Sequence, residues 1–205
     1  MPVVIAKDRP ETRERAARIV ANGGVIAFLT DTFYGLGADP LNAAAVRKIK
    51  TLKGREDRKP ILLLISDPAQ VDRFIHQAEF FKLVARKHWP GALTLIGAAR
   101  SVVPEELTAG TKSLGVRLPD DETVRTLVRT CGGALTATSA NPSGQPAART
   151  AREVESYFST GVDLIVDGGD AKVTEPSTVL DVSTSQPKLV REGLVTRKAL
   201  KELFE

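Results

Sequence analysis

The residues most suited to chemistry lie in two segments, one rich in hydroxyl groups and one rich in cations. Residues 30–37 (TDTFYGLG) directly follow the apolar run 25–29, and Lys53 and Arg55 come further along the chain. An apolar strand that opens into threonines and glycines predicts a rigid edge from which polar groups can reach a ligand. Lysine adds a mobile point charge, and arginine adds a planar fork that grips phosphate or carboxylate through two parallel bonds. Together the two segments favour a site for an anion.

Two further arginines end apolar, strand-like stretches. Arg117 closes the segment 115–117 (GVR), and Arg191 closes the segment 189–191 (LVR). A guanidinium that is buried in such a strand requires a partner, and an anionic ligand is a natural one.

The other polar segments have simpler explanations when each is taken alone. Residues 138–144 (TSANPSG) follow an apolar run, but Ser and Asn commonly hydrogen-bond to their own backbone where a strand ends. Lys53 and Arg55 also fit the exposed end of a helix, whose dipole favours cations. Residues 177–179 (STV) fit the first turn of a strand. These segments gain a functional interpretation only from their combination.

Motifs of several other chemistries are incomplete in the sequence. Residues 110–113 (GTKS) lack the glycine that a P-loop has directly before its lysine, and residues 35–37 (GLG) lead to Pro40, where a dinucleotide fingerprint needs a third glycine. The Gly-x-Ser-x-Gly elbow of many hydrolases does not occur. Cys131 is the single cysteine and the two histidines lack metal-ligand spacing, so we expect neither an internal disulfide nor a protein-built metal site.

The composition indicates a globular protein with a local excess of positive charge. The 205 residues suffice for a single domain, residues 1–205, and 42% of them are hydrophobic and 26% charged. No apolar run reaches the roughly twenty residues that span a bilayer, and the N-terminus lacks the pattern of a signal peptide, so we expect a cytoplasmic protein. The net charge is +4, and the cations gather in residues 47–59. That cluster is compatible with a solvated helix end, a polyphosphate site or a nucleic-acid surface.

Strand-like and helix-like segments alternate along the chain, which predicts an α/β fold. The strands after residue 164 lack helices between them, so we expect a mixed sheet. Capping signals mark helix ends at residues 22–24 (NGG), at Asn42 and at Asp67. Loops are expected at residues 99–111 and 168–176. The predicted strands are 3–6, 25–29, 61–65, 93–97, 114–117, 135–138, 164–167, 178–182 and 188–191, and the predicted helices are 11–21, 43–52, 67–75, 79–88, 122–130, 149–158 and 197–204.

The motifs, taken in their order along the chain, resemble those of the YrdC family of threonylcarbamoyl-AMP synthases, from residue 25 to residue 193. The resemblance implies an α/β fold with a twisted open mixed sheet, flanking helices and a large concave basic cavity. It also implies that L-threonine, bicarbonate and ATP react to give threonylcarbamoyl-AMP and pyrophosphate. A separate transferase would then use this product to make threonylcarbamoyladenosine in tRNA. The motifs that carry the resemblance are TDTFYGLG (30–37), KGR (53–55), GVRLP (115–119), TSANPSG (138–144), STV (177–179) and VREG (190–193).

The same resemblance implies which residues bind the two larger substrates. Lys53 and Arg55 are implied as the catalytic cations that meet the polyphosphate as pyrophosphate departs. Mg²⁺ is expected to arrive bound mainly through ATP phosphates and water. The implied threonine-binding residues are Thr32, Arg117 and Ser177, with Thr30 and Lys50 shaping the pocket. The implied ATP-binding residues are Lys53, Arg55, Lys59, Ser113, Ser139, Asn141 and Arg191.

The sequence departs from the family pattern at two positions and leaves other functions open. Leu29 stands where many members have proline, and Leu64 stands where some longer members have a histidine near threonine. The sequence runs to Glu205, and we expect no counterpart of the C-terminal domain of the longer members. One alternative is a protein without this activity that binds double-stranded RNA or tRNA through the basic surface. The other is a relative that acts on a different carbamoyl or nucleotide substrate. An aromatic content of 5% disfavours base stacking on single strands but leaves phosphate recognition possible.

Overall fold

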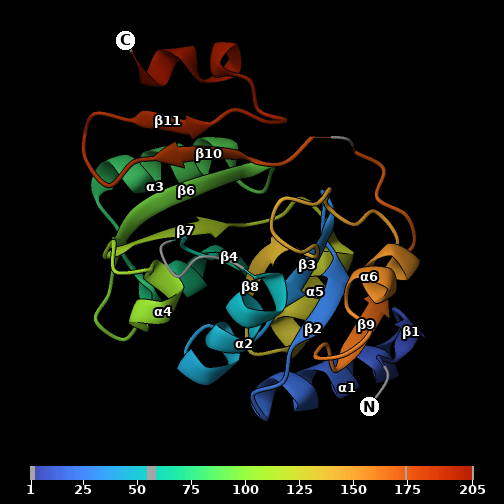
Figure 1. Cartoon of the computed structure of the whole chain (residues 1–205). Helices are drawn as coiled ribbons and strands as arrows, with labels where there is room; N and C mark the ends of the chain where they lie inside the picture. The colour runs from blue at the N-terminus through green and yellow to red at the C-terminus, as the bar shows by residue number, and fades with distance from the viewer. Residues whose placement is uncertain (1–2, 55–58, 174, 205) are drawn as a thin grey trace.

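A computed structural model describes residues 3–54, 59–173 and 175–204, which form a twisted mixed sheet with helices on its two faces (Figure 1). The strands are β1 (Ile5–Lys7), β2 (Ile26–Leu29), β3 (Tyr34–Gly37), β4 (Leu62–Ile65), β5 (Ile75–His76), β6 (Leu93–Ala99), β7 (Ser113–Arg117), β8 (Ala134–Ser139), β9 (Leu164–Asp167), β10 (Thr178–Asp181) and β11 (Lys188–Arg191). The α-helices are α1 (Pro10–Ala21), α2 (Ala43–Lys53), α3 (Glu79–His88), α4 (Glu105–Thr108), α5 (Glu122–Thr130) and α6 (Ala151–Tyr157), and the 3-10 helices are η1 (Pro68–Arg73) and η2 (Arg197–Leu203).

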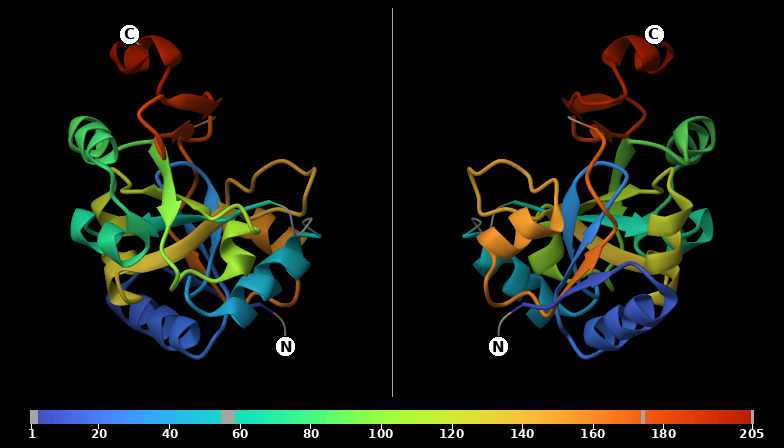
Figure 2. Two further views of the ribbon diagram at one scale, coloured as in Figure 1. Left: turned by 90° about the vertical axis from the view of Figure 1, so that its left-hand side faces the viewer. Right: turned by 90° about the vertical axis from the view of Figure 1, so that its right-hand side faces the viewer.

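The strand order is β1-β9-β2-β3-β8-β4-β7-β6-β10-β11, and the short β5 pairs with β6. Parallel pairs join β1 to β9, β9 to β2, β4 to β7 and β6 to β10, and the other neighbours are antiparallel. The predicted mixed sheet with flanking helices is therefore confirmed. The strands β10 and β11, together with η2, stand at one end of the molecule, and the N-terminus lies at the opposite end (Figure 2).

The alternation of side chains along the strands produces one hydrophobic core on each face of the sheet. On β2, Ile26 and Phe28 pack with buried residues of α1 and α5. Ala27, which lies between them, packs in the larger core that includes residues of α2 and α6. Because every second residue points to the same face, these runs of successive apolar residues are covered by helices on both sides.

The ends of α2 follow from local sequence and determine where its last residues lie. The side chain of Asn42 accepts a hydrogen bond from the amide of Ala45, as expected for an N-terminal cap. Gly54 ends the helix with φ = 55°, a left-handed conformation that glycine adopts without a steric penalty. Lys53 is thereby the last residue of the helix and is buried.

The structure differs from the predicted elements mainly where tertiary pairing decides the conformation. Residues 34–37 (YGLG) were predicted as part of a turn but form β3, because they pair with β2 and β8 on both sides. The segment predicted as a helix at 67–75 is the 3-10 helix η1 followed by β5, and the predicted loop at 99–111 contains α4. Glycine-rich and short segments have weak intrinsic preferences, so neighbouring strands determine what they become.

In the described part of the chain, none of the helices combines the length and the apolar character that crossing a bilayer requires.

Candidate functional site

A cavity with a volume of about 410 Å³ is lined by residues from several of the sequence motifs. Its walls come from the turn between β2 and β3, the beginning of β4, the last residue of β7 and the end of β8. The segment before β10 and the last residue of β11 complete it. The polar side chains that line it belong to Thr30, Thr32, Tyr34, Arg117, Thr138, Ser139, Asn141, Gln145, Ser177 and Arg191.

The turn between β2 and β3 holds its two threonine hydroxyls in a fixed arrangement. The Thr30 hydroxyl donates to the carbonyl of Phe33 at 2.8 Å and accepts from the amide of Thr32 at 3.1 Å. The Thr32 hydroxyl lies 3.1 Å from the Thr30 hydroxyl oxygen. Because the Thr30 proton is directed to the backbone, Thr30 shapes the turn, and Thr32 offers the more available hydroxyl to a ligand.

Arg117 is buried in the cavity wall and is paired with Asp31. Its Nη1 donates to Asp31 Oδ1 at 2.6 Å, and the exposed fractions of the two side chains are 4% and 11%. Burial opposes both charges: it raises the pKa of Asp31 and lowers the pKa of Arg117, and each partner counteracts the shift of the other. The Nε of Arg117 is buried and has no hydrogen-bond partner among the residues that the structure describes. A buried N–H without a partner costs about 1 to 3 kcal/mol, which an acceptor atom of a ligand would recover.

Arg191 is held against the segment that precedes β10. Its Nε and Nη2 donate to the carbonyl of Ser177 at 3.2 and 2.8 Å, and its Nη2 lies 3.3 Å from the Ser177 hydroxyl. The chain after β11 passes so close to this segment that a Cβ on Gly193 would lie 2.1 Å from the carbonyl oxygen of Pro176. Glycine at position 193 therefore allows the segment after β11 to pack directly against the backbone of residues 176 and 177.

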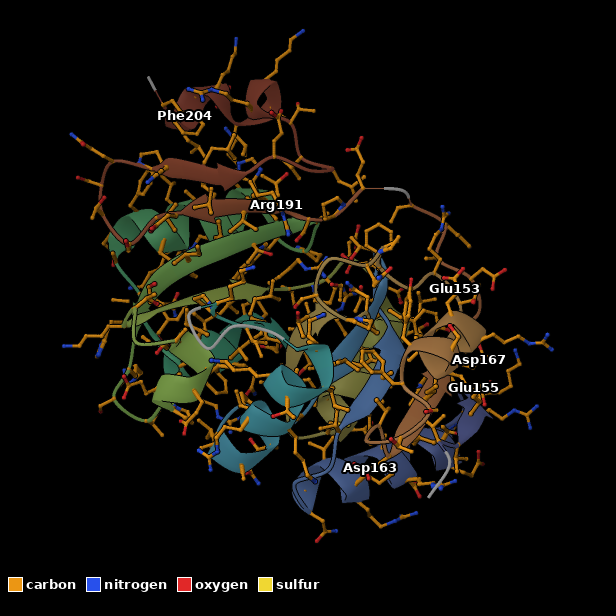
Figure 3. The ribbon with its side chains drawn as sticks, viewed as in Figure 1. Glu153, Glu155, Asp163, Asp167, Arg191 and Phe204 are labelled. Atoms are coloured by element: carbon orange, nitrogen blue, oxygen red, sulfur yellow. The ribbon has the colours of Figure 1, made fainter. Side chains whose placement is uncertain are left out.

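The cavity has an excess of positive charge in its walls. Burial, followed by the proximity of Arg117, lowers the pKa of Arg191, so the two guanidiniums repel each other. The described lining residues include these two arginines and no carboxylate, and the nearby Asp31 pairs with Arg117. Arg191 lies among the C-terminal strands, apart from the acidic side chains Glu153, Glu155, Asp163 and Asp167 near α6 and β9 (Figure 3). A carboxylate or phosphate in the cavity would relieve this repulsion.

A second cluster lies where β8 ends, and Lys53 supports it from behind. The Lys53 ammonium donates to the carbonyl of Asn141 at 2.7 Å and also to the carbonyl of Ser139. The Lys53 carbonyl accepts from the amide of Ser143 at 2.7 Å. These bonds fix the segment 139–143 to the end of α2. Since Ser139 and Asn141 line the cavity, Lys53 positions two of its polar side chains.

The side chain of Asn141 keeps one unused acceptor. Its Nδ2 donates to the carbonyls of Pro142 at 2.9 Å and Gln145 at 2.7 Å. Its Oδ1 is buried and accepts no hydrogen bond from any described residue. A ligand that offers an N–H or O–H group would satisfy this oxygen. The cavity thus presents donors from the arginines and an acceptor from Asn141.

The structure brings most of the predicted site residues together, but not all of them. Lys59 is exposed, Lys50 and Lys53 are buried without lining the cavity, and Arg55 lies outside the described residues. Ser113 begins β7, which Arg117 ends, so about 13 Å of strand separates them. The predicted residues that line the cavity are Thr30, Thr32, Arg117, Ser139, Asn141, Ser177 and Arg191.

Two residues with clear roles in the cavity wall were not singled out from the sequence. Asp31 is the partner of Arg117. The need of a buried arginine for a counter-ion could have directed attention to a nearby carboxylate such as Asp31. The Tyr34 hydroxyl donates to Gly169 O at 2.8 Å and contacts Asp167 Oδ1 at 3.2 Å, which ties the wall to the loop after β9. Burial and the proximity of Asp167 raise the pKa of Tyr34, so this hydroxyl stays protonated.

The two departures from the family pattern lie outside the cavity lining. Leu64 is fully buried in the core that includes α5, and Leu29 is a partly buried residue at the end of β2. Neither side chain lines the cavity. Among the described residues, no group of three or more His, Cys, Asp or Glu side chains is arranged to hold a metal ion.

Comparison with known proteins places the chain in a well-populated group. The family model Sua5_yciO_yrdC, described as telomere recombination, matches residues 18–193. A threonylcarbamoyl-AMP synthase of Idiomarina loihiensis is 38% identical over 83% of this chain and 94% of its own length. A synthase of the same description from Pyrococcus abyssi is 35% identical over 87% of this chain.

Solved structures give the same result for the fold. The crystal structure of P. abyssi Sua5 complexed with L-threonine has a TM-score of 0.92 and 30% identity, and the match covers 99% of this chain and 61% of that one. The crystal structure of E. coli YciO has a TM-score of 0.85 and 25% identity, and covers 96% of this chain and 97% of that one. The chain spans about half the length of some relatives, namely 53% of the P. abyssi synthase and 56% of that from Bacillus subtilis.

Proposed function

The chain belongs to the Sua5, YciO and YrdC family, and from this premise we propose that it is a threonylcarbamoyl-AMP synthase. It uses L-threonine, bicarbonate and ATP, and it releases pyrophosphate. The observation that carries the proposal is that one cavity is lined both by Thr32, Arg117 and Ser177 and by Ser139 and Asn141. An amino acid and a nucleotide can therefore be held side by side in this cavity.

The arginine-rich part of the cavity suits the amino acid. The buried Nε of Arg117 supplies a charged donor for the threonine carboxylate. The hydroxyls of Thr32 and Ser177 suit the amine and the hydroxyl of the substrate. Because Asp31 already pairs with Arg117, this guanidinium suits a group with a single negative charge, such as a carboxylate.

The segment after β8 suits the nucleotide. Ser139 and Asn141 line the cavity, and Lys53 holds them in place. We assign Arg55, Lys59, Ser113 and the charge of Lys53 to ATP as well, together with Arg191. Mg²⁺ would come with ATP, bound mainly through the ATP phosphates and water, and would help to neutralise their charge.

The proposed reaction needs alignment and charge neutralisation from the protein. Bicarbonate condenses with the threonine amine to give a carbamate and water: an N–C bond forms while a C–O bond of bicarbonate breaks. A carbamate oxygen then attacks the α-phosphorus of ATP while the bond to pyrophosphate breaks. Nucleotidyl transfer of this kind depends on positioning the reactants and balancing the charge of the leaving group. The cationic walls described above would supply both, and no nucleophile of the protein takes part.

The product leaves for a second protein in this proposal. A tRNA threonylcarbamoyl transferase consumes the adenylate, and we place both steps in the cytoplasm. Residues 1–205 act as one catalytic domain. Contact with tRNA or other double-stranded RNA through the basic residues 47–59 accompanies this role and does not replace it.

Product analysis tests the proposal directly. Purified protein is incubated with ATP, Mg²⁺, L-threonine and isotopically labelled bicarbonate, and the products are separated and weighed by mass spectrometry. We expect a labelled threonylcarbamoyl adenylate and pyrophosphate, and neither should form when threonine or bicarbonate is omitted. ATP turnover that is indifferent to threonine, or tight RNA binding without the adenylate, would reject the assignment.

A further inference from the structure

Thr94, a buried residue of β6, lies behind the cavity wall and contacts the lining residue Ser177. Thr94 is 1% exposed, and its hydroxyl oxygen lies 3.1 Å from the hydroxyl oxygen of Ser177. Thr94 does not line the cavity itself. Its neighbours Leu93 and Leu95 are fully buried in the larger core, so the alternation of the strand turns Thr94 to the opposite face, toward Ser177.

The backbone around Thr94 leaves this side chain little freedom. Strand β6 pairs in parallel with β10, and Thr94 is in register with Val179, two residues after Ser177. On the other side, a Cβ on Gly115 would lie 3.1 Å from the Thr94 methyl carbon. Glycine at position 115 therefore leaves just enough room for threonine. The hydroxyl of Thr94 is in this way held at a fixed distance from Ser177.

The hydrogen bonds available to the Ser177 hydroxyl show how Thr94 can orient it. A serine hydroxyl has one proton to donate and two positions at which it accepts. Arg191, which can only donate, occupies one acceptor position of Ser177 through its Nη2. If Thr94 donates to the other, the Ser177 proton points to an acceptor on the ligand. If Ser177 donates to Thr94, the remaining acceptor position can receive an N–H or O–H of the ligand.

We propose that Thr94 is a positioning residue for the amino-acid part of the cavity. Its hydroxyl fixes the orientation of the Ser177 hydroxyl, whereas the guanidinium of Arg191 is held mainly by the Ser177 carbonyl. Since a threonine hydroxyl both donates and accepts, Thr94 lets Ser177 serve an amino acid before and after its amine becomes a carbamate. This inference deepens the proposed function and rests on it, because it names a residue that supports threonine recognition.

The test compares Thr94→Val, which keeps the shape and removes the hydroxyl, with Thr94→Ser, which keeps the hydroxyl. Thr136→Val serves as the matched control, since Thr136 is also fully buried and its hydroxyl bonds to the amide of Ala38. Affinities for L-threonine and for ATP are measured separately by calorimetric titration, after thermal unfolding shows that each variant is folded.

We expect Thr94→Val to weaken threonine binding by about three- to tenfold, the cost of one net hydrogen bond, and to leave the ATP affinity within about twofold. Thr94→Ser should recover most of the lost affinity, and Thr136→Val should not alter the threonine affinity. An unchanged threonine affinity in Thr94→Val, equal weakening for both ligands, or no recovery in Thr94→Ser would overturn the inference.

A crystal structure of Thr94→Val separates this inference from the proposed function. If the unaltered protein does not bind threonine, the proposed function fails, and the position of Ser177 in the variant still decides the role of Thr94. A Ser177 side chain that has turned away from Arg191 supports positioning by Thr94. An unchanged contact between Ser177 and Arg191 refutes it.

Discussion

Replacing Arg117 by lysine keeps the charge in the cavity wall but removes the planar fork. In the structure one arm of the guanidinium is bonded to Asp31 at 2.6 Å, and the buried Nε has no hydrogen-bond partner in the described part of the chain. A lysine ammonium is a single compact group, so it can remain with Asp31 or reach the ligand, but it cannot hold both in the same geometry. The variant therefore loses one charge-assisted hydrogen bond to the amino acid.

The loss of such a bond costs about 1.5 to 3 kcal/mol, which corresponds to roughly a ten- to hundredfold weaker affinity for L-threonine. We expect the ATP affinity of Arg117→Lys to change much less, because Ser139 and Asn141 are untouched. Calorimetric titration of each ligand separately measures both effects, with Arg129→Lys on the exposed face of α5 as the control. Equal weakening for both ligands, or none for threonine, would show that Arg117 is only a structural partner of Asp31.

Three further predictions concern Lys53, Asp167 and Cys131. Lys53→Ala should raise the KM for ATP, lower kcat/KM by about ten- to a hundredfold and lower the Tm, because the carbonyls of Ser139 and Asn141 lose their charged donor. Unaltered ATP kinetics in the folded variant would refute this prediction. Burial raises the pKa of Asp167, but the bond from Lys7 and the other hydrogen bonds outweigh it and hold the pKa below 3.8, so Asp167→Asn should cost about 1 kcal/mol at neutral pH. The wild-type advantage should vanish in urea titrations as the pH falls through the folded-state pKa, and a difference that persists in acid would contradict this assignment. Burial raises the pKa of Cys131 to about 12. Its alkylation by iodoacetamide at pH 8 should therefore be about a thousandfold slower than that of a free thiol of pKa 9.0. Rapid labelling of the folded protein would show that the pKa of this thiol is not raised.

The sequence was most informative where a local pattern, such as an arginine at the end of an apolar strand or a capping residue before a helix, requires a hydrogen-bond or ionic partner. Arg117 and Arg191 each end an apolar strand, and an anionic ligand was expected as the partner of a cation buried there. Both line one cavity, where Arg117 is buried and paired with Asp31 and Arg191 is exposed, so an anionic ligand for either one stays a prediction. The caps of α2 and η1 were also predictable, because Asn42 and Asp67 act on amides two or three residues away. Interactions of this kind depend on neighbours in the chain and not on the fold.

Long-range pairing was beyond the reach of the sequence. Asp31 and Arg117 are 86 residues apart, and nothing in either segment specifies the other as its partner. Lys53 was expected to face the polyphosphate, yet its side chain turns toward the carbonyls after β8, because the direction of a side chain at a helix end depends on what packs beside it. Contact of this lysine with ATP stays a prediction. Strand β3 was missed for the same reason, since its glycines have no strand preference of their own.

The close passage of Gly193 over Pro176 has a consequence for the order in which the protein acquires its site. The strands β2, β3 and β8 are complete long before the chain reaches residue 177, so the wall with Ser139 can form early in synthesis. The cavity also needs Ser177, which directly precedes β10, and Arg191, which ends β11. Strand β10 pairs with β11 and, across a large separation in sequence, with β6. Contacts between such distant residues form slowly, because their loops must close first. We therefore expect a nascent chain to form the wall with Ser139 before the part with Ser177 and Arg191, so that the cavity is complete only in the last step of folding.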